Sequence, residues 1–161
     1  MTTQNAQRVV RAHTQTIGAT PQRVFPLLCP VREAEWLDGW SYEMVHSESG
    51  VAEEGCVFVS PSAALPETVW VITRHDAGAG VVEFARVTWG LAATLLRLEV
   101  EPSPGDRTAL HVRYTHTALT PEGRQFIEER FSQQAFAAAM TWWERSLNHY
   151  LATGALLRKE S

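Results

Sequence analysis

The chain has 161 residues, enough for one domain with a substantial hydrophobic core and too few for two ordinary domains. Apolar residues make up 45%, charged residues 20%, and the net charge is -4; this balance argues against a nucleic-acid binder, which normally needs a basic face. No apolar run approaches the roughly 20 residues of a membrane span, and the N-terminus lacks the apolar core of a signal peptide. We expect one cytoplasmic domain over residues 1–161, with no integral membrane segment.

The first quarter of the chain predicts one strand followed by two short helices. Residues 8–17 are rich in β-branched side chains, which favour a strand. Thr20 is suited to cap a helix and Pro21 to occupy its first position, so a short helix is expected over residues 21–28. A second short helix is expected over residues 31–37, before a turn.

The middle of the chain predicts a run of antiparallel strands separated by turns rich in Gly, Pro and Asp. The expected strands cover residues 40–47, 56–60, 67–75, 81–89, 91–101 and 107–118. Residues 76–80 are typical of a hairpin loop, and residues 61–66 are expected to form a longer loop. No internal repeat or linker interrupts this part, so a single domain is expected.

From Thr120 to about Leu157 the sequence predicts one long helix, which begins with an N-cap residue and a proline. Its apolar side chains fall into two stripes on roughly opposite sides. The stripe of the N-terminal half consists of Ile127, Phe131, Ala135, Ala138 and Trp142, and the stripe of the C-terminal half consists of Phe136, Met140, Trp143, Leu147 and Leu151. Because the stripes overlap over residues 135–140, the helix should be buried on more than one side.

Three interpretations of this helix are open. It is wedged between the sheet and the short helices, or one stripe faces a cavity, or it forms a homodimer contact. We expect the C-terminal stripe to grip the sheet and the N-terminal stripe to face the cavity.

The order of strand, two short helices, six-stranded meander and long helix is the helix-grip order. Residues 17–25, 31–40 and 120–123 carry a resemblance to the SRPBCC superfamily, also called START-like or Bet v 1-like, and to its polyketide cyclase/dehydrase-type bacterial members. The resemblance covers about residues 8–155. It implies an α+β helix-grip fold, in which a curved antiparallel sheet of about six or seven strands wraps around the C-terminal helix and leaves an apolar cavity.

Family members bind lipids, polyketides, hormones or aromatic metabolites; some are enzymes, such as aromatase/cyclases, and others are carriers, relatives of Hsp90 activators, or toxin-like partners of larger assemblies. The family shares no catalytic residue set, so the resemblance does not decide whether the chain is an enzyme.

Candidate polar residues for a cavity come from the strands. In residues 107–118 the apolar face carries Tyr114 and His116, which could hydrogen-bond a ligand or move a proton, or simply fill the core. In residues 81–89 either face could point inward, so Arg86 is either a buried cation that needs an anionic partner or a surface residue.

The sequence gives little indication of a carboxylate pair, a redox cysteine pair or a metal site. Glu33 and Glu35 lie two apart on a helix and point in different directions, so no working carboxylate pair is expected. Cys29 and Cys56 lack redox spacing and are predicted to be reduced. The six histidines show no metal-binding spacing, so neither a metal nor a cofactor is expected.

The first functional hypothesis is a non-catalytic binder or carrier of a small apolar or amphipathic ligand, such as a lipid, polyketide or aromatic metabolite. The alternatives are a cyclase/dehydratase-type enzyme and a protein-interaction module of the Hsp90-activator or toxin-like kind. A cluster of His, Tyr and Arg around one point would favour the enzyme. The candidate cavity residues are Trp36, Trp70, Phe84, Arg86, Leu98, Tyr114, His116, Phe131, Ala135, Ala138 and Trp142.

Overall fold

A computed structural model describes residues 7–61 and 66–160 of the chain. Its strands are β1 (Arg8–Ile17), β2 (Glu43–His46), β3 (Val57–Ser60), β4 (Thr68–Asp76), β5 (Val81–Thr88), β6 (Ala92–Ser103) and β7 (Arg107–Ala118). Its helices are α1 (Pro21–Val24), the 3-10 turn η1 (Phe25–Leu27), α2 (Pro30–Trp36), α3 (Pro121–Arg130) and α4 (Gln133–Thr153).

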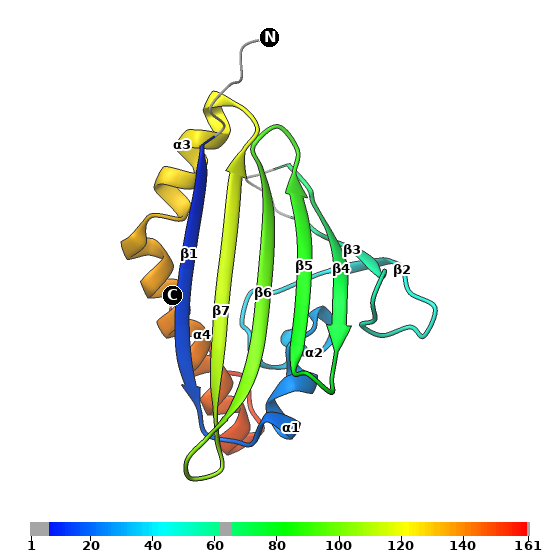
Figure 1. The fold of residues 1–161 in the computed structure, drawn as a ribbon, viewed down its shortest axis with the longest axis vertical. Coiled ribbons are helices and arrows are strands. Elements are labelled where there is room, and N and C mark those ends of the chain that lie inside the picture. The colour runs from blue at the N-terminus through cyan, green and yellow to red at the C-terminus, as the bar shows by residue number, and fades with distance from the viewer. Residues whose placement is uncertain (1–6, 62–65, 161) are drawn as a thin grey trace.

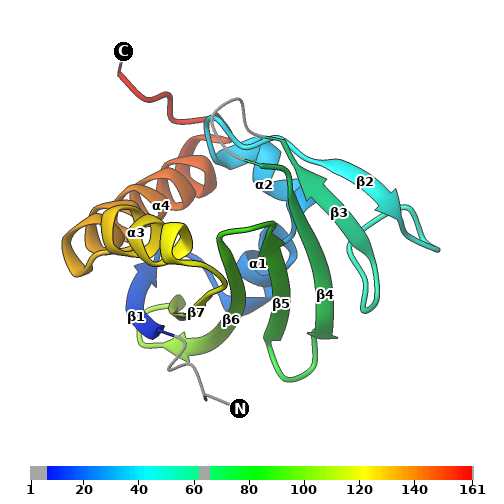
Figure 2. The same ribbon diagram turned by 90° about the horizontal axis from the view of Figure 1, so that it is seen from above.

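The seven strands form one antiparallel sheet in the order β1-β7-β6-β5-β4-β3-β2 (Figure 1). The sheet curves, and the helices lie on its concave side (Figure 2). This is the predicted α+β helix-grip architecture. The strand expected over residues 40–47 is shorter, and the strand expected over 91–101 extends to Ser103. Residues 62–65 of the expected loop lie outside the described residues.

The expectation of a single helix from Thr120 to Leu157 is wrong, because the chain breaks at Phe131 and Ser132. Ser132 has extended backbone angles, and its hydroxyl oxygen accepts a hydrogen bond from the N–H of Ala135 at 3.1 Å, so it caps a new helix. The helix α4 then ends at Thr153, where Gly154 adopts a left-handed φ of 73° and donates to the Tyr150 carbonyl.

The stripe predicted to grip the sheet lies on α4 and is buried. Phe136, Met140 and Leu147 belong to the core, and Trp143 and Leu151 pack against it. The helix lies along β1, where the buried Gln15 side chain donates to the Met140 carbonyl at 3.0 Å. This bond fixes the position of α4 over the concave face.

The shorter helix α3 lies across the ends of β6 and β7. Gly123 approaches the Leu91 carbonyl so closely that an added Cβ would lie 1.8 Å from the oxygen. Only glycine fits this approach. It holds α3 in place and thereby positions Phe131 at the junction with α4.

The inward face of β5, which the sequence left open, carries the even-numbered residues. Val82, Phe84 and Thr88 are buried, whereas Val87 is exposed and Trp89, just beyond the strand, is 79% exposed. Arg86 therefore points to the concave side. On β7 the predicted inward face is confirmed, with Tyr114 and His116 both buried.

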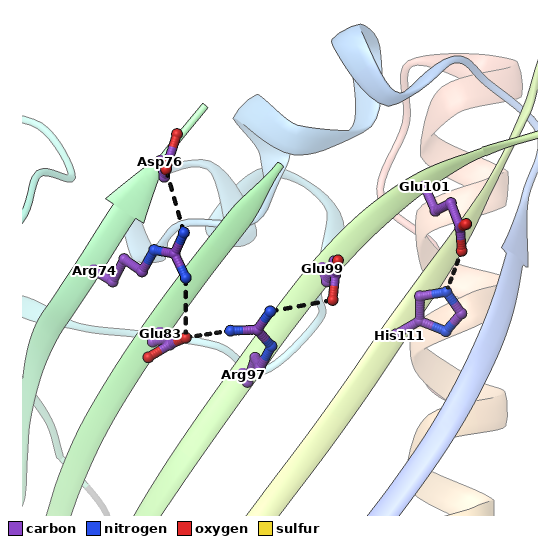
Figure 3. A network of polar contacts seen from close by, with 7 residues as sticks. All are labelled: Arg74, Asp76, Glu83, Arg97, Glu99, Glu101 and His111. Atoms are coloured by element: carbon purple, nitrogen blue, oxygen red, sulfur yellow. Dashed lines mark hydrogen bonds and ion pairs between the residues drawn. The ribbon is translucent and has the colours of Figure 1, made fainter. Parts of the chain in front are cut away.

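The convex face of the sheet carries a network of ion pairs (Figure 3). The guanidinium of Arg74 contacts Asp76 and Glu83, and that of Arg97 contacts Glu83 and Glu99. These side chains are partly exposed, so each pair contributes little to stability, at most about 1 kcal/mol.

Within the described ranges no helix is long and apolar enough to cross a membrane. The expected cytoplasmic location stays a prediction. Cys29 and Cys56 are buried free thiols, as predicted.

Candidate functional site

A pocket of about 220 Å³ lies between the concave face of the sheet and the helices α2 and α4. Seven elements and the turn after α2 contribute to it. It is lined by Glu33, Leu37, Trp40, Phe58, Trp70, Phe84, Arg86, Leu96, Tyr114 and Trp143. We call it the inner pocket.

The walls of the inner pocket are mostly aromatic and are fixed by their own contacts. The rings of Phe58 and Trp70 stack at 5.5 Å, and Trp40 and Phe84 meet the Trp70 ring edge-on. The Trp70 indole N–H donates to the Ser60 hydroxyl, and the Trp40 indole N–H to the Pro30 carbonyl, both at 2.9 Å. Because their polar atoms are already satisfied, these rings form a preformed apolar surface.

Arg86 places a cation in this apolar pocket. Its guanidinium carbon lies 5.0 Å from the Trp70 ring centre, 5.4 Å from that of Tyr114 and 5.3 Å from that of Phe131. Among residues 7–61 and 66–160 it has no hydrogen-bond acceptor and no carboxylate within 4 Å. Burial lowers its pKa from the ordinary value. Arg74 and Arg97 of the convex face, in contrast, are each paired with carboxylates (Figure 3).

Glu33 is the second ionisable group of the inner pocket. It is only 8% exposed, and its carboxyl makes no hydrogen bond with any residue that the structure describes. Burial raises the pKa of Glu33 to about 8, so the carboxyl is mostly protonated at neutral pH. Glu35, two residues on, points outward and pairs with Arg32.

The sequence prediction gave Glu33 no role because it considered only whether Glu33 and Glu35 could act as a carboxylate pair. The spacing of Glu33 relative to other residues of the helix indicates that it lies on the buried face. Pro30, Glu33 and Trp36 recur every three residues, and all three are buried in α2. A carboxyl on the buried face of a helix is uncommon and indicates a functional site.

Tyr114 and His116 lie on β7, which β6 separates from β5, and the Tyr114 ring contacts the Arg86 guanidinium across the concave face. Burial raises the pKa of Tyr114 to about 12, although the positive charge of Arg86 opposes this. Burial also lowers the pKa of His116 to about 3, so its imidazole is neutral. The Nδ1 atom of His116 shares a hydrogen bond of 2.8 Å with the Thr94 hydroxyl, and its ring packs on Phe131 at 4.1 Å. The Nε2 atom is buried and has no partner in the described part of the chain.

The structure brings only some of the predicted cavity residues together. Trp70, Phe84, Arg86 and Tyr114 line the inner pocket, and Phe131 and His116 stand next to it. The remaining predicted residues lie elsewhere. Trp36 and Leu98 are fully buried in the core, Ala135 is half-buried on α4, and Ala138 and Trp142 face a groove on the outer side of α4.

The break between α3 and α4 explains the outward position of Ala138 and Trp142. It interrupts the predicted N-terminal stripe, so residues beyond Ser132 no longer continue the face that carries Phe131.

That outer groove has a volume of about 790 Å³ and shares Leu37, Trp40 and Trp143 with the inner pocket. The segment after α4 forms its other wall. Leu157 pairs with Leu37 in a parallel β-bridge, and the Lys159 N–H donates to the Asp38 carboxylate at 2.9 Å. The three shared side chains thus separate the inner pocket from an open surface.

No protein-family model matches the chain, and no curated protein matches it in sequence. Solved structures do match in fold. Norcoclaurine synthase from Thalictrum flavum has a TM-score of 0.69 at 11% identity and covers 92% of this chain and 88% of its own. The ZhuI aromatase/cyclase from Streptomyces sp. R1128 has a TM-score of 0.66 at 14% identity, covering 94% and 100%. Ara h 8.0201 has a TM-score of 0.62 at 15% identity, covering 91% and 99%.

These similarities define a helix-grip fold. The fold is of the SRPBCC type, also called Bet v 1-like, as the sequence resemblance predicts. Identities of 11–15% establish the fold alone. Within the described residues, no group of three or more His, Cys, Asp or Glu side chains is arranged to hold a metal ion.

Proposed function

We propose that the protein binds a small, mostly apolar molecule in the inner pocket and acts as a non-catalytic binder or carrier. The observation that carries this proposal is the preformed aromatic pocket itself. Its walls of Trp, Phe and Leu side chains are fixed by the fold, and it offers few polar groups. Its structural neighbours include a synthase and an aromatase/cyclase, so the same fold also supports catalysis.

A thermal-shift screen with small aromatic and lipid compounds tests the binding proposal. A ligand at 100 times its Kd should raise the free energy of unfolding by about 2.7 kcal/mol, since it binds only the folded state. Leu96→Trp should abolish this effect because it fills the pocket, whereas Leu95→Trp, on the opposite face of β6, should not. A screen without saturable stabilisation, or with equal stabilisation of both variants, contradicts the proposal.

The second candidate is the cyclase/dehydratase-type enzyme, and Glu33 is the observation that favours it. A carboxyl with a pKa of about 8 can exchange a proton near neutral pH. Arg86 lines the same pocket and could hold the negative charge of an enolate oxygen. The proton on the carbon next to a carbonyl would move to the Glu33 carboxylate, and the electron pair of that C–H bond would form the enolate.

Deuterium exchange tests this second candidate without knowledge of the natural substrate. The protein should accelerate exchange of the α-protons of 1-tetralone in D₂O, with a rate that rises as pH approaches about 8 because Glu33 must be ionised. Glu33→Gln should lower the enzyme-dependent rate by about 10²–10⁴-fold, and Glu35→Gln should leave it unchanged. Absence of any protein-dependent exchange would leave the binder as the only supported function. The interaction module and the homodimer stay predictions.

A further inference from the structure

We propose that the ligand of the inner pocket is an organic acid, with a flat apolar body and one carboxylate that binds the guanidinium of Arg86. The inference rests on the proposed binding function and adds the chemical class of the ligand.

The first step is the environment of the guanidinium. Three aromatic rings surround it, with its carbon 5.0–5.4 Å from their centres. Aromatic rings stabilise a cation through their faces, but they do not supply the in-plane acceptors that five N–H groups require. The N–H groups of Arg86 have no acceptor among the residues that the structure describes. They remain available to a ligand because Arg86 lines the pocket.

The second step is the missing counter-charge. Arg86 is only partly exposed, and a cation held largely out of water is costly unless an anion pairs with it. Glu33 is the one acidic residue among the ten that line the pocket, and it forms no ion pair with Arg86. Buried on the α2 side, it is mostly protonated at neutral pH and adds a hydrogen-bond donor instead of a negative charge. The charge balance of the pocket is therefore completed only by an anion from outside.

The third step is the shape of that anion. A guanidinium presents parallel N–H groups that match the two oxygens of a carboxylate. The remaining walls are apolar and aromatic, and they include Phe58, Phe84 and Leu96. With about 220 Å³, the pocket is smaller than the roughly 300 Å³ at which sites for drug-sized ligands begin. The body that fits is therefore small, with one or two rings.

Calorimetric titration with a matched pair of probes tests this inference. The probes are 2-naphthoate and its uncharged amide, 2-naphthamide, which share the same ring system. We expect the wild-type protein to bind the acid at least tenfold more tightly than the amide. Arg86→Met should remove this preference and leave the affinity for the amide within about threefold of the wild-type value. Arg86→Lys should retain part of the preference, because lysine keeps the positive charge but lacks the parallel N–H groups of the guanidinium. Arg97→Met, on the convex face, should behave as the wild type.

The outcomes separate the inference from the function on which it rests. If acid and amide bind equally, or if Arg86→Met keeps the preference, the pocket is a binding site but the ligand is not recognised as an acid. If neither probe nor any compound of the screen binds, the binding function itself fails. The comparison of acid with amide on the wild-type protein needs no variant, so it holds even if Arg86→Met does not fold.

Discussion

Glu33→Gln should raise the free energy of unfolding by about 5 kcal/mol at pH 9 and leave it nearly unchanged at pH 4. The carboxyl of Glu33 has a pKa of about 8 in the folded protein, against an ordinary value of 4.5. Because the folded-state pKa is raised, the stabilising contribution of the neutral carboxyl is complete below pH 4.5 and is lost as pH rises to about 8. Each pKa unit corresponds to about 1.36 kcal/mol, which gives the expected difference.

Urea denaturation of both proteins between pH 4 and pH 9 measures this effect. Other titrating groups cancel in the difference between the two curves. Glu35→Gln is the matched control, since its carboxylate lies at the surface of the same helix and pairs with Arg32, and its curve should run parallel to that of the wild type. If the free energy of unfolding of Glu33→Gln followed that of the wild type in parallel at all pH values, water would reach the Glu33 carboxyl. The proposed proton exchange in the pocket would then lose its support.

Arg86→Met should stabilise the ligand-free protein by about 1–3 kcal/mol at neutral pH. The substitution removes a partly buried charge that has no counter-ion among the described residues and leaves an apolar side chain of similar length among Trp70, Tyr114 and Phe131. The lost contacts between the cation and the rings reduce this gain. Binding sites commonly contain groups that lower the stability of the ligand-free protein.

Chemical denaturation of the two ligand-free proteins checks this prediction. Arg97→Met should lower the free energy of unfolding by no more than about 1 kcal/mol, because it only breaks partly exposed ion pairs. A clear loss of stability in Arg86→Met would show that the aromatic contacts outweigh desolvation. The cation would then be a structural group that needs no ligand.

The sequence allowed most of the architecture to be predicted because regular alternation follows burial directly. On β7, one face is consistently apolar, so the inward position of Tyr114 and His116 could be predicted. On β5, both faces carry apolar residues, so the alternation did not decide that Arg86 points inward. The pattern alone could not distinguish a buried arginine from a surface one.

The errors have equally local causes. The apolar spacing resumes at Ala135, four residues after Phe131, so periodicity concealed a helix break that depends on one serine cap. That break moved Ala138 and Trp142 to the outer groove. Glu33 could not be recognised from its neighbours in sequence, since its burial depends on how α2 packs beneath the sheet. Pocket residues from several distant elements, such as Phe58 and Leu96, meet only in the folded chain.

The indole N–H resonances of ¹⁵N-labelled protein test the central claim most directly, because the tryptophans report on separate places. Trp40, Trp70 and Trp143 line the inner pocket, and Trp89 is exposed in the turn after β5. On titration with 2-naphthoate, the three pocket resonances should shift together and saturate, while that of Trp89 stays in place. Shifts confined to Trp89, or no saturable shift of the pocket tryptophans, would contradict ligand binding in the inner pocket.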